Sequence, residues 1–207
     1  MDEILPGVLH WATYHGGIGS EVHSHLHLPS GALFDPLLPE DVSPETLAEA
    51  GVVPTVVLLS NRHHLRSGAA IAEAFGIEIR CQDSGLWEFE DPSDPEVRGF
   101  AYGEEVVPGV TALELGALTP EDTVFRLDAG PGALLFADGL TRPAGALAFV
   151  PDGLMGDDPA AVRHGLRERL AGLAERDDFD ALLFAHGAPL PEGGRAALRE
   201  FVAAQAG

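Results

Sequence analysis

The chain has 207 residues and a formal net charge of −21, from 12 lysine and arginine residues against 33 aspartate and glutamate residues. A surface this acidic repels phosphate groups, which argues against a nucleic-acid partner and against an anionic membrane surface. The single cysteine, Cys81, excludes a disulfide framework and a metal cage built from cysteines. No apolar run reaches the roughly 18 residues that a spanning helix needs, and the first residues lack the basic start of a signal peptide. We therefore expect a cytoplasmic protein with one domain over residues 1–207, whose 45% apolar residues suffice for a large core.

The first half of the sequence predicts strands, followed by alternating helix and strand. Residues 22–28 alternate strictly, which predicts a strand with Val22, Ser24, Leu26 and Leu28 on one face and His23, His25 and His27 on the other. The next expected elements are a turn over 29–31, a strand over 32–35, a short helix from Ser43 that ends before Gly51, a buried strand over 55–59, a helix that ends at Gly76 and a strand over 77–81. Residues 82–109 are expected to be mainly loop.

The second half repeats this order of elements. It predicts strands over 123–127 and 133–136, a long helix from Asp158 that buries Val162, Leu166, Leu170 and Leu173, a buried strand over 181–185 and a last helix from about Gly194. The residues of 29–35 (Pro-Ser-Gly-Ala-Leu-Phe-Asp) echo those of 130–138 (Gly-Pro-Gly-Ala-Leu-Leu-Phe-Ala-Asp). Two similar halves of this kind would pack sheet on sheet, with helices outside.

Polar residues follow three of the expected buried strands directly. These are the segment 61–66, Asp138 and His186. Ligand sites of α/β folds lie at the carboxyl ends of strands, and imidazole and carboxylate are natural ligands of zinc and iron. The sequence therefore predicts a site, with metal ligands among its candidates, where these segments meet.

Residues 56–68 (Val-Val-Leu-Leu-Ser-Asn-Arg-His-His-Leu-Arg-Ser-Gly) resemble a motif of the metallo-β-lactamase superfamily, an apolar strand followed by Thr-His-x-His-x-Asp-His and a helix. Aligned with this motif, Ser60 takes the threonine position, and Asn61 and His63 take the first two histidine positions. Leu65 and Arg66 take the positions of the aspartate and the last histidine.

Four further segments resemble that superfamily in order and spacing. Residues 114–120 resemble its Gly-His-Thr-Pro stretch, with Leu118 at the histidine position. Residues 134–139 and 182–187 resemble the strands that end in its bridging aspartate and its last histidine, which are matched here by Asp138 and His186. Residues 32–36 resemble the early strand whose aspartate, here Asp35, supports the site from behind. The resemblance implies an α/β four-layer αββα sandwich built from two similar halves.

The resemblance also implies a metal-dependent hydrolase with a reduced centre, because only His63, Asp138 and His186 of the ligand positions are kept. In this interpretation these three residues hold one zinc or iron ion, and His64 or water completes the coordination. Hydrolysis of an ester, thioester or lactone is then expected, with Asp138 and His63 as catalytic residues. Arg62, Arg66, Asn61 and His64 would bind a small, anionic substrate.

An alternative interpretation has no metal. Arg66 would bring its guanidinium to Asp138 and replace the missing positive charge, while Leu65 and Leu118 fill the vacated volume. The chain would then be a non-catalytic protein that binds a small anion. His23, His25 and His27 are interpreted as the polar face of a strand; a histidine pair that binds a metal, or one imidazole that lines the cleft, are the alternatives.

Overall fold

The first half of the chain forms one sheet. The computed structural model describes residues 1–49 and 51–205. The first sheet has the strand order β1-β2-β3-β4-β5-β6-β7. Its strands are β1 (Asp2–Leu5), β2 (Val8–His15), β3 (Ser20–His27), β4 (Ala32–Phe34), β5 (Val56–Leu58), β6 (Glu78–Gln82) and β7 (Val97–Phe100).

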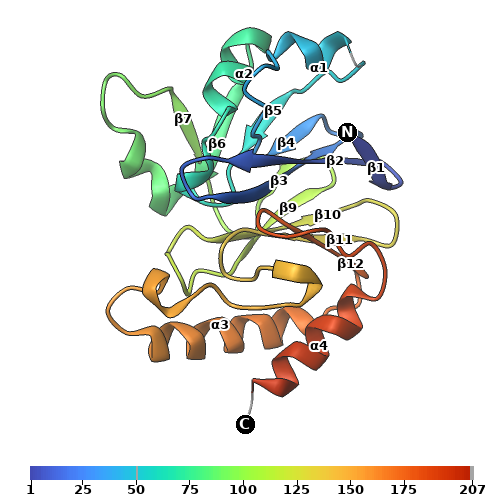
Figure 1. Cartoon of the computed structure of the whole chain (residues 1–207), viewed down its shortest axis with the longest axis vertical. Helices are drawn as coiled ribbons and strands as arrows, with labels where there is room; N and C mark the ends of the chain where they lie inside the picture. The colour runs from blue at the N-terminus through green and yellow to red at the C-terminus, as the bar shows by residue number, and fades with distance from the viewer. Residues whose placement is uncertain (50, 206–207) are drawn as a thin grey trace.

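The second half forms another sheet, in the order β12-β11-β10-β9-β8. Its strands are β8 (Glu105–Val107), β9 (Val110–Glu114), β10 (Thr123–Leu127), β11 (Ala133–Phe136) and β12 (Ala181–Phe184). The two sheets lie face to face in the middle of the molecule (Figure 1).

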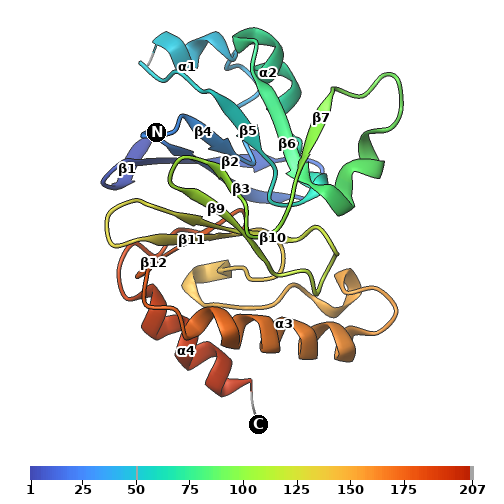
Figure 2. The same cartoon turned by 180° about the vertical axis from the view of Figure 1, so that it is seen from behind.

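Helices cover the outer face of each sheet, which gives the expected four layers. Helices α1 (Glu45–Glu49) and α2 (Gly68–Phe75) lie on the first sheet, and α3 (Pro159–Ala174) and α4 (Gly194–Ala204) lie on the second (Figures 1 and 2). Four short 3-10 turns complete the elements: η1 (Arg62–His64), η2 (Asp83–Phe89), η3 (Pro143–Gly145) and η4 (Asp152–Leu154). Asp158 begins α3 as predicted, because its carboxylate accepts a hydrogen bond from the backbone N–H of Ala161 at 3.0 Å.

The predicted likeness of the two halves is confirmed in their strand pairing. In the first sheet β3 pairs antiparallel with β4, and β4 pairs parallel with β5. In the second sheet β10 pairs antiparallel with β11, and β11 pairs parallel with β12. Because each parallel step is joined by a crossover that contains a helix, the polar residues after β4, β5, β11 and β12 come to equivalent places.

Apolar side chains fill all three spaces between the layers. The space between the sheets holds Phe34, Phe100 and Phe125, whose ring centroids lie 5.1 Å (Phe34–Phe125) and 5.7 Å (Phe100–Phe125) apart. The space under α3 and α4 takes Leu166, Leu170 and Leu173 as predicted, with Val162 partly buried beside them. This packing holds both sheets rigidly around the strand ends.

The segment 82–109 differs from the expected loop. It contains η2, β7 and β8. β7 is a short edge strand that pairs parallel with β6, and Figure 2 shows it beside β6 at one end of the first sheet. Its four residues include a glycine, and its strand conformation depends on the pairing with β6, so local composition does not reveal it.

The histidines of β3 lie between the sheets. His23, His25 and His27 are at most 7% exposed. Their cross-strand neighbours include Val8 on β2 and Phe34 on β4, both in the apolar core between the sheets. The imidazole face of β3 is therefore buried, and Leu26 on the other face packs under the helices of the first sheet.

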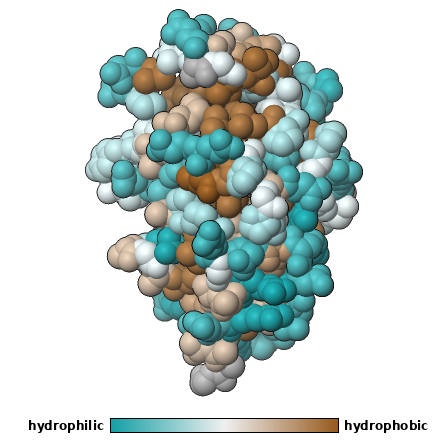
Figure 3. Space-filling model, turned by 90° about the vertical axis from the view of Figure 1, so that its right-hand side faces the viewer, coloured by the Kyte–Doolittle hydropathy of each residue, from teal (hydrophilic) through white to brown (hydrophobic). Residues whose placement is uncertain are grey.

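The molecular surface is uneven in polarity. One side shows patches of hydrophobic surface in the half that holds α1, α2 and the first sheet, whereas the half that holds the second sheet and its helices is more hydrophilic (Figure 3). Within residues 1–49 and 51–205, no helix is long and apolar enough to cross a membrane.

Candidate metal centre

Four strand ends meet at one edge of the sandwich. Asp35 follows β4, His64 lies in the 3-10 turn η1 after β5, Asp138 follows β11 and His186 follows β12. Two backbone hydrogen bonds tie the sheets together here, from His23 N–H to the Ala185 carbonyl (2.9 Å) and from Thr123 N–H to the Ser60 carbonyl (2.9 Å). The fold thus brings together side chains that are more than a hundred residues apart.

His64, Asp138 and His186 point one ligand atom each at a common space. His186 Nε2 lies 3.0 Å from Asp138 Oδ1, and His64 Nε2 lies 3.5 Å from the same oxygen. The two Nε2 atoms are 3.3 Å apart. All three ligand atoms lie within 4.8 Å of one another, and two imidazoles with one carboxylate are a donor set that zinc and iron accept.

Asp35 fixes the orientation of the His64 ring from behind. Its Oδ2 lies 3.2 Å from His64 Nδ1, and its side chain is fully buried. The backbone N–H of Ser60 donates to Asp35 Oδ1 at 2.9 Å, and the Ser60 hydroxyl donates to Oδ2. When a carboxylate accepts the proton of Nδ1, the lone pair of Nε2 points toward the shared space. Histidines that bind metal ions are commonly oriented in this way.

The charges at this edge stabilise one another. Burial and the Arg66 guanidinium lower the pKa of His64, but the carboxylates of Asp35 and Asp138 outweigh them and raise it to about 9. Burial alone would raise the pKa of Asp138, yet His64 and His186 hold it well below its usual range. The pKa of Asp35 is lowered in the same way, because His64, Arg66 and the Ser60 hydroxyl outweigh its burial. Without a metal, His64 is therefore an imidazolium between two carboxylates.

His63 is not part of this group. Its side chain is exposed, and its backbone N–H donates to Asn61 Oδ1 at 2.9 Å. His64, and not the predicted His63, is therefore the histidine of this turn that lies beside Asp138 and His186. Residues 62–64 form a 3-10 turn, in which neighbouring side chains point about 120° apart, so only one of the two adjacent histidines can face Asp138.

Arg66 does not pair with Asp138, in contrast to the ion pair expected in the metal-free interpretation. Its Nη1 donates to the backbone carbonyls of Asp35 (2.8 Å) and His23 (3.4 Å). Among the described residues it forms no ion pair with a carboxylate. The Arg66 backbone lies in the left-handed region, with a φ of +44°. Its guanidinium group contacts the two carbonyl oxygens just named.

Arg62 is engaged elsewhere. It forms an ion pair with the buried Glu121 and a second with Glu88, at 3.3 Å from Nε, and its guanidinium lies 4.9 Å from the centre of the Trp87 ring. These contacts join η1 to η2. The predicted role of Arg62 as a free cation for a substrate does not agree with this geometry.

Asn61 directly contacts the candidate metal centre, which is formed by His64, Asp138 and His186. Its Nδ2 donates to Asp138 Oδ2 at 3.1 Å, while its Oδ1 caps the 3-10 turn. Asp138 therefore presents Oδ1 to the two histidines and Oδ2 to Asn61. Leu65 and Leu118 do not fill one shared volume, because Leu65 packs with the core of the first sheet and Leu118 with that of the second.

The sequence analysis did not single out Asp122, a buried acidic side chain whose pKa the charge of Asp138 affects. Asp122 is completely buried, neither of its carboxylate oxygens has a hydrogen-bond partner among the described side chains and backbone, and burial and the Asp138 charge raise its pKa well above the usual range. The only signal was an acidic pair, Glu121 and Asp122, directly before a buried strand.

No protein-family model and no curated protein matches the sequence. Solved structures match the fold over nearly the whole chain. A metallo-β-lactamase family protein of Thermus thermophilus aligns with a TM-score of 0.68 at 17% identity, over 98% of this chain and 80% of its own. The class B3 di-zinc metallo-β-lactamase LRA-12 from an Alaskan soil metagenome gives 0.68 at 12% identity, over 98% and 90%. BJP-1, a subclass B3 metallo-β-lactamase of Bradyrhizobium japonicum, gives 0.61 at 17% identity, over 99% and 89%. The chain has the metallo-β-lactamase fold, as the sequence motifs implied.

Proposed function

We propose that this metallo-β-lactamase-fold chain is a hydrolase with a single metal ion, held by His64, Asp138 and His186, and that it acts on a small ester, thioester or lactone. The observation that carries the proposal is the convergence of the three ligand atoms within 4.8 Å, with Asp35 on the far nitrogen of His64. A catalytic metal site uses three protein ligands and keeps one position open, and these residues fit that description. The ion we propose is zinc or iron.

Such an ion supplies a water molecule of lowered pKa and polarises a substrate carbonyl. The residues of the chain hold and orient the groups around it. Asp35 accepts the Nδ1 proton of His64, so that Nε2 faces the centre, and Asn61 holds Asp138 Oδ2 so that Oδ1 faces the same point.

The proposed substrate needs no anionic group. Arg62 is neutralised by Glu88 and Glu121, and Arg66 is occupied by two backbone carbonyls. Uncharged esters, thioesters and lactones are therefore the first substrates to test.

Metal analysis of the untagged protein, purified without added metal or chelator, tests the proposal. We expect about one equivalent of zinc or iron. His64→Ala and His186→Ala should each lose the ion, whereas the matched control His63→Ala should keep it, because that neighbouring side chain is exposed. Metal that is absent from the wild-type protein, or retained by both ligand variants, contradicts the proposal.

A further inference from the structure

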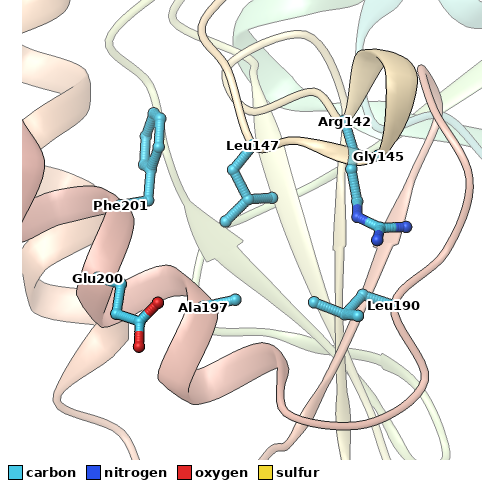
Figure 4. A pocket seen from close by; sticks show the side chains of 7 residues that line it. All are labelled: Arg142, Gly145, Leu147, Leu190, Ala197, Glu200 and Phe201. Atoms are coloured by element: carbon cyan, nitrogen blue, oxygen red, sulfur yellow. The ribbon is translucent and has the colours of Figure 1, made fainter.

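A hollow lies between η3 and α4, and none of the three candidate metal ligands lines it. Its volume is about 330 Å³, and Figure 4 shows the side chains that surround it. Its lining residues are Arg142, Gly145, Leu147, Leu190, Ala197, Glu200 and Phe201. The lining combines one cation, one anion and a set of apolar groups.

Arg142 is held rigidly at one side of this hollow. Its Nη1 donates to the carbonyls of Ala188 and Pro189, both at 3.0 Å. A methyl group placed on Gly145, which lines the hollow, would lie 3.9 Å from Arg142 Nη2, so this second amino group stands at the wall. No carboxylate among the described residues forms an ion pair with Arg142. A fixed guanidinium with a free amino group is prepared to bind a carboxylate.

Glu200 stands on the opposite side. It belongs to α4, it is exposed, and it forms no ion pair within the described part of the chain. Figure 4 shows the carboxylate of Glu200 and the guanidinium of Arg142 on opposite sides of the hollow, with Leu147, Leu190 and Ala197 between them. The two charges are thus separated by an apolar floor instead of neutralising each other.

We propose that this hollow binds a small zwitterion that carries a carboxylate and an ammonium group at the two ends of a short methylene chain. The carboxylate would pair with Arg142, the ammonium group with Glu200, and the methylene groups would cover the leucine side chains and Ala197. An α-amino acid carries both charged groups on one carbon atom, so it would place no methylene chain over the apolar side chains that lie between Arg142 and Glu200.

This ligand would sit close to the backbone that carries the metal centre. Arg142 N–H donates to the His186 carbonyl at 2.9 Å, and the Arg142 backbone pairs with Gly187. The binding site itself does not depend on the proposed hydrolase activity, and its test needs no bound metal.

Calorimetric titration of the full chain with 6-aminohexanoate, hexanoate and hexylamine tests the proposal. Hexylamine should bind about tenfold or more weakly than 6-aminohexanoate, because it lacks the group that meets the partly buried Arg142. Hexanoate should bind about three- to fivefold more weakly, because the contact it loses is an exposed ion pair with Glu200.

Three variants separate the contributions. Glu200→Gln should make 6-aminohexanoate and hexanoate bind equally, and Arg142→Gln should remove the preference over hexylamine. Ala197→Leu places a larger side chain in the hollow and should abolish binding of all three compounds. Leucine is a good helix former, so α4 should remain folded. The control Glu192→Gln changes an exposed carboxylate outside the hollow and should leave binding unchanged. Equal binding of the three compounds to the wild-type protein, an unchanged preference in Glu200→Gln, or no binding of 6-aminohexanoate overturns the proposal.

Discussion

The proton that His64 holds between two carboxylates makes the stability of the metal-free protein depend on pH. The pKa of His64 is about 9 in the folded protein and about 6.5 in an unfolded chain. Because the folded state binds this proton more tightly, its contribution is complete below pH 6.5 and is lost as the pH rises from 6.5 to 9. The difference, at about 1.4 kcal/mol for each tenfold change in proton affinity, amounts to about 3 kcal/mol. His64 is only 4% exposed, so solvent screening reduces this value little.

Urea unfolding at pH 6.5, 7.5 and 9, with a chelator present throughout, measures this effect. The free energy of unfolding of the wild-type protein should fall by about 3 kcal/mol across the series. His64→Gln, which keeps a polar side chain of similar size but cannot take up the proton, should be less stable at pH 6.5 and lose little more by pH 9. The reasoning is refuted if the wild-type protein and the variant show the same slope, or if wild-type stability rises with pH. Saturating zinc should flatten the wild-type slope, because the ion then takes the place of the proton.

Three further predictions concern residues around the centre. Asp35→Asn should weaken zinc binding about 10- to 100-fold in a competition titration with a coloured chelator, because His64 loses the carboxylate that orients it; an unchanged affinity would contradict this role. Burial and neighbouring positive charges lower the pKa of His23 to about 4, so its contribution to stability is present above pH 6.5 and falls by about 3 kcal/mol as the pH drops toward 4. Urea unfolding between pH 6.5 and 5 should therefore show a shallower slope for His23→Gln than for the wild-type protein, and equal slopes would argue against a buried neutral imidazole. Gly187→Ala should lower the free energy of unfolding by about 2 kcal/mol or more, because Gly187 has a φ of +118° and an added methyl group would overlap the carbonyl oxygen of Arg142; a melting temperature within about 2 °C of the wild type would refute this.

The layers and two of the three centre residues could be predicted from local pattern. The two runs of apolar strand, crossover helix and apolar strand predicted two packed sheets, because each sheet must bury one face against the other and one against helices. Asp138 and His186 follow buried strands directly, and the direction of a parallel strand determines where the residue after it emerges.

The third centre residue and the partners of the arginines depended on tertiary structure. Whether His63 or His64 faces Asp138 depends on a single 3-10 turn that Asn61 caps. A shift of this turn by one residue would exchange the two imidazoles. Arg62 and Arg66 find their partners in segments that no local pattern connects to them, η2 in one case and two backbone carbonyls in the other.

The acidic composition of the chain argues against nucleic-acid and anionic-membrane partners, which stays a prediction, and it did not locate a site. The sequence by itself determined the order of the strands and crossover helices that carry the site, because apolar periodicity and strand ends are local properties of the chain. It did not reveal the strands β1, β2, β7, β8 and β9. The tertiary structure alone decided which histidines are buried between the sheets and which one faces Asp138, because burial and convergence depend on neighbours that are distant in the sequence. A side chain's protonation and partners follow from those neighbours, and His64 became the central cation for that physical reason.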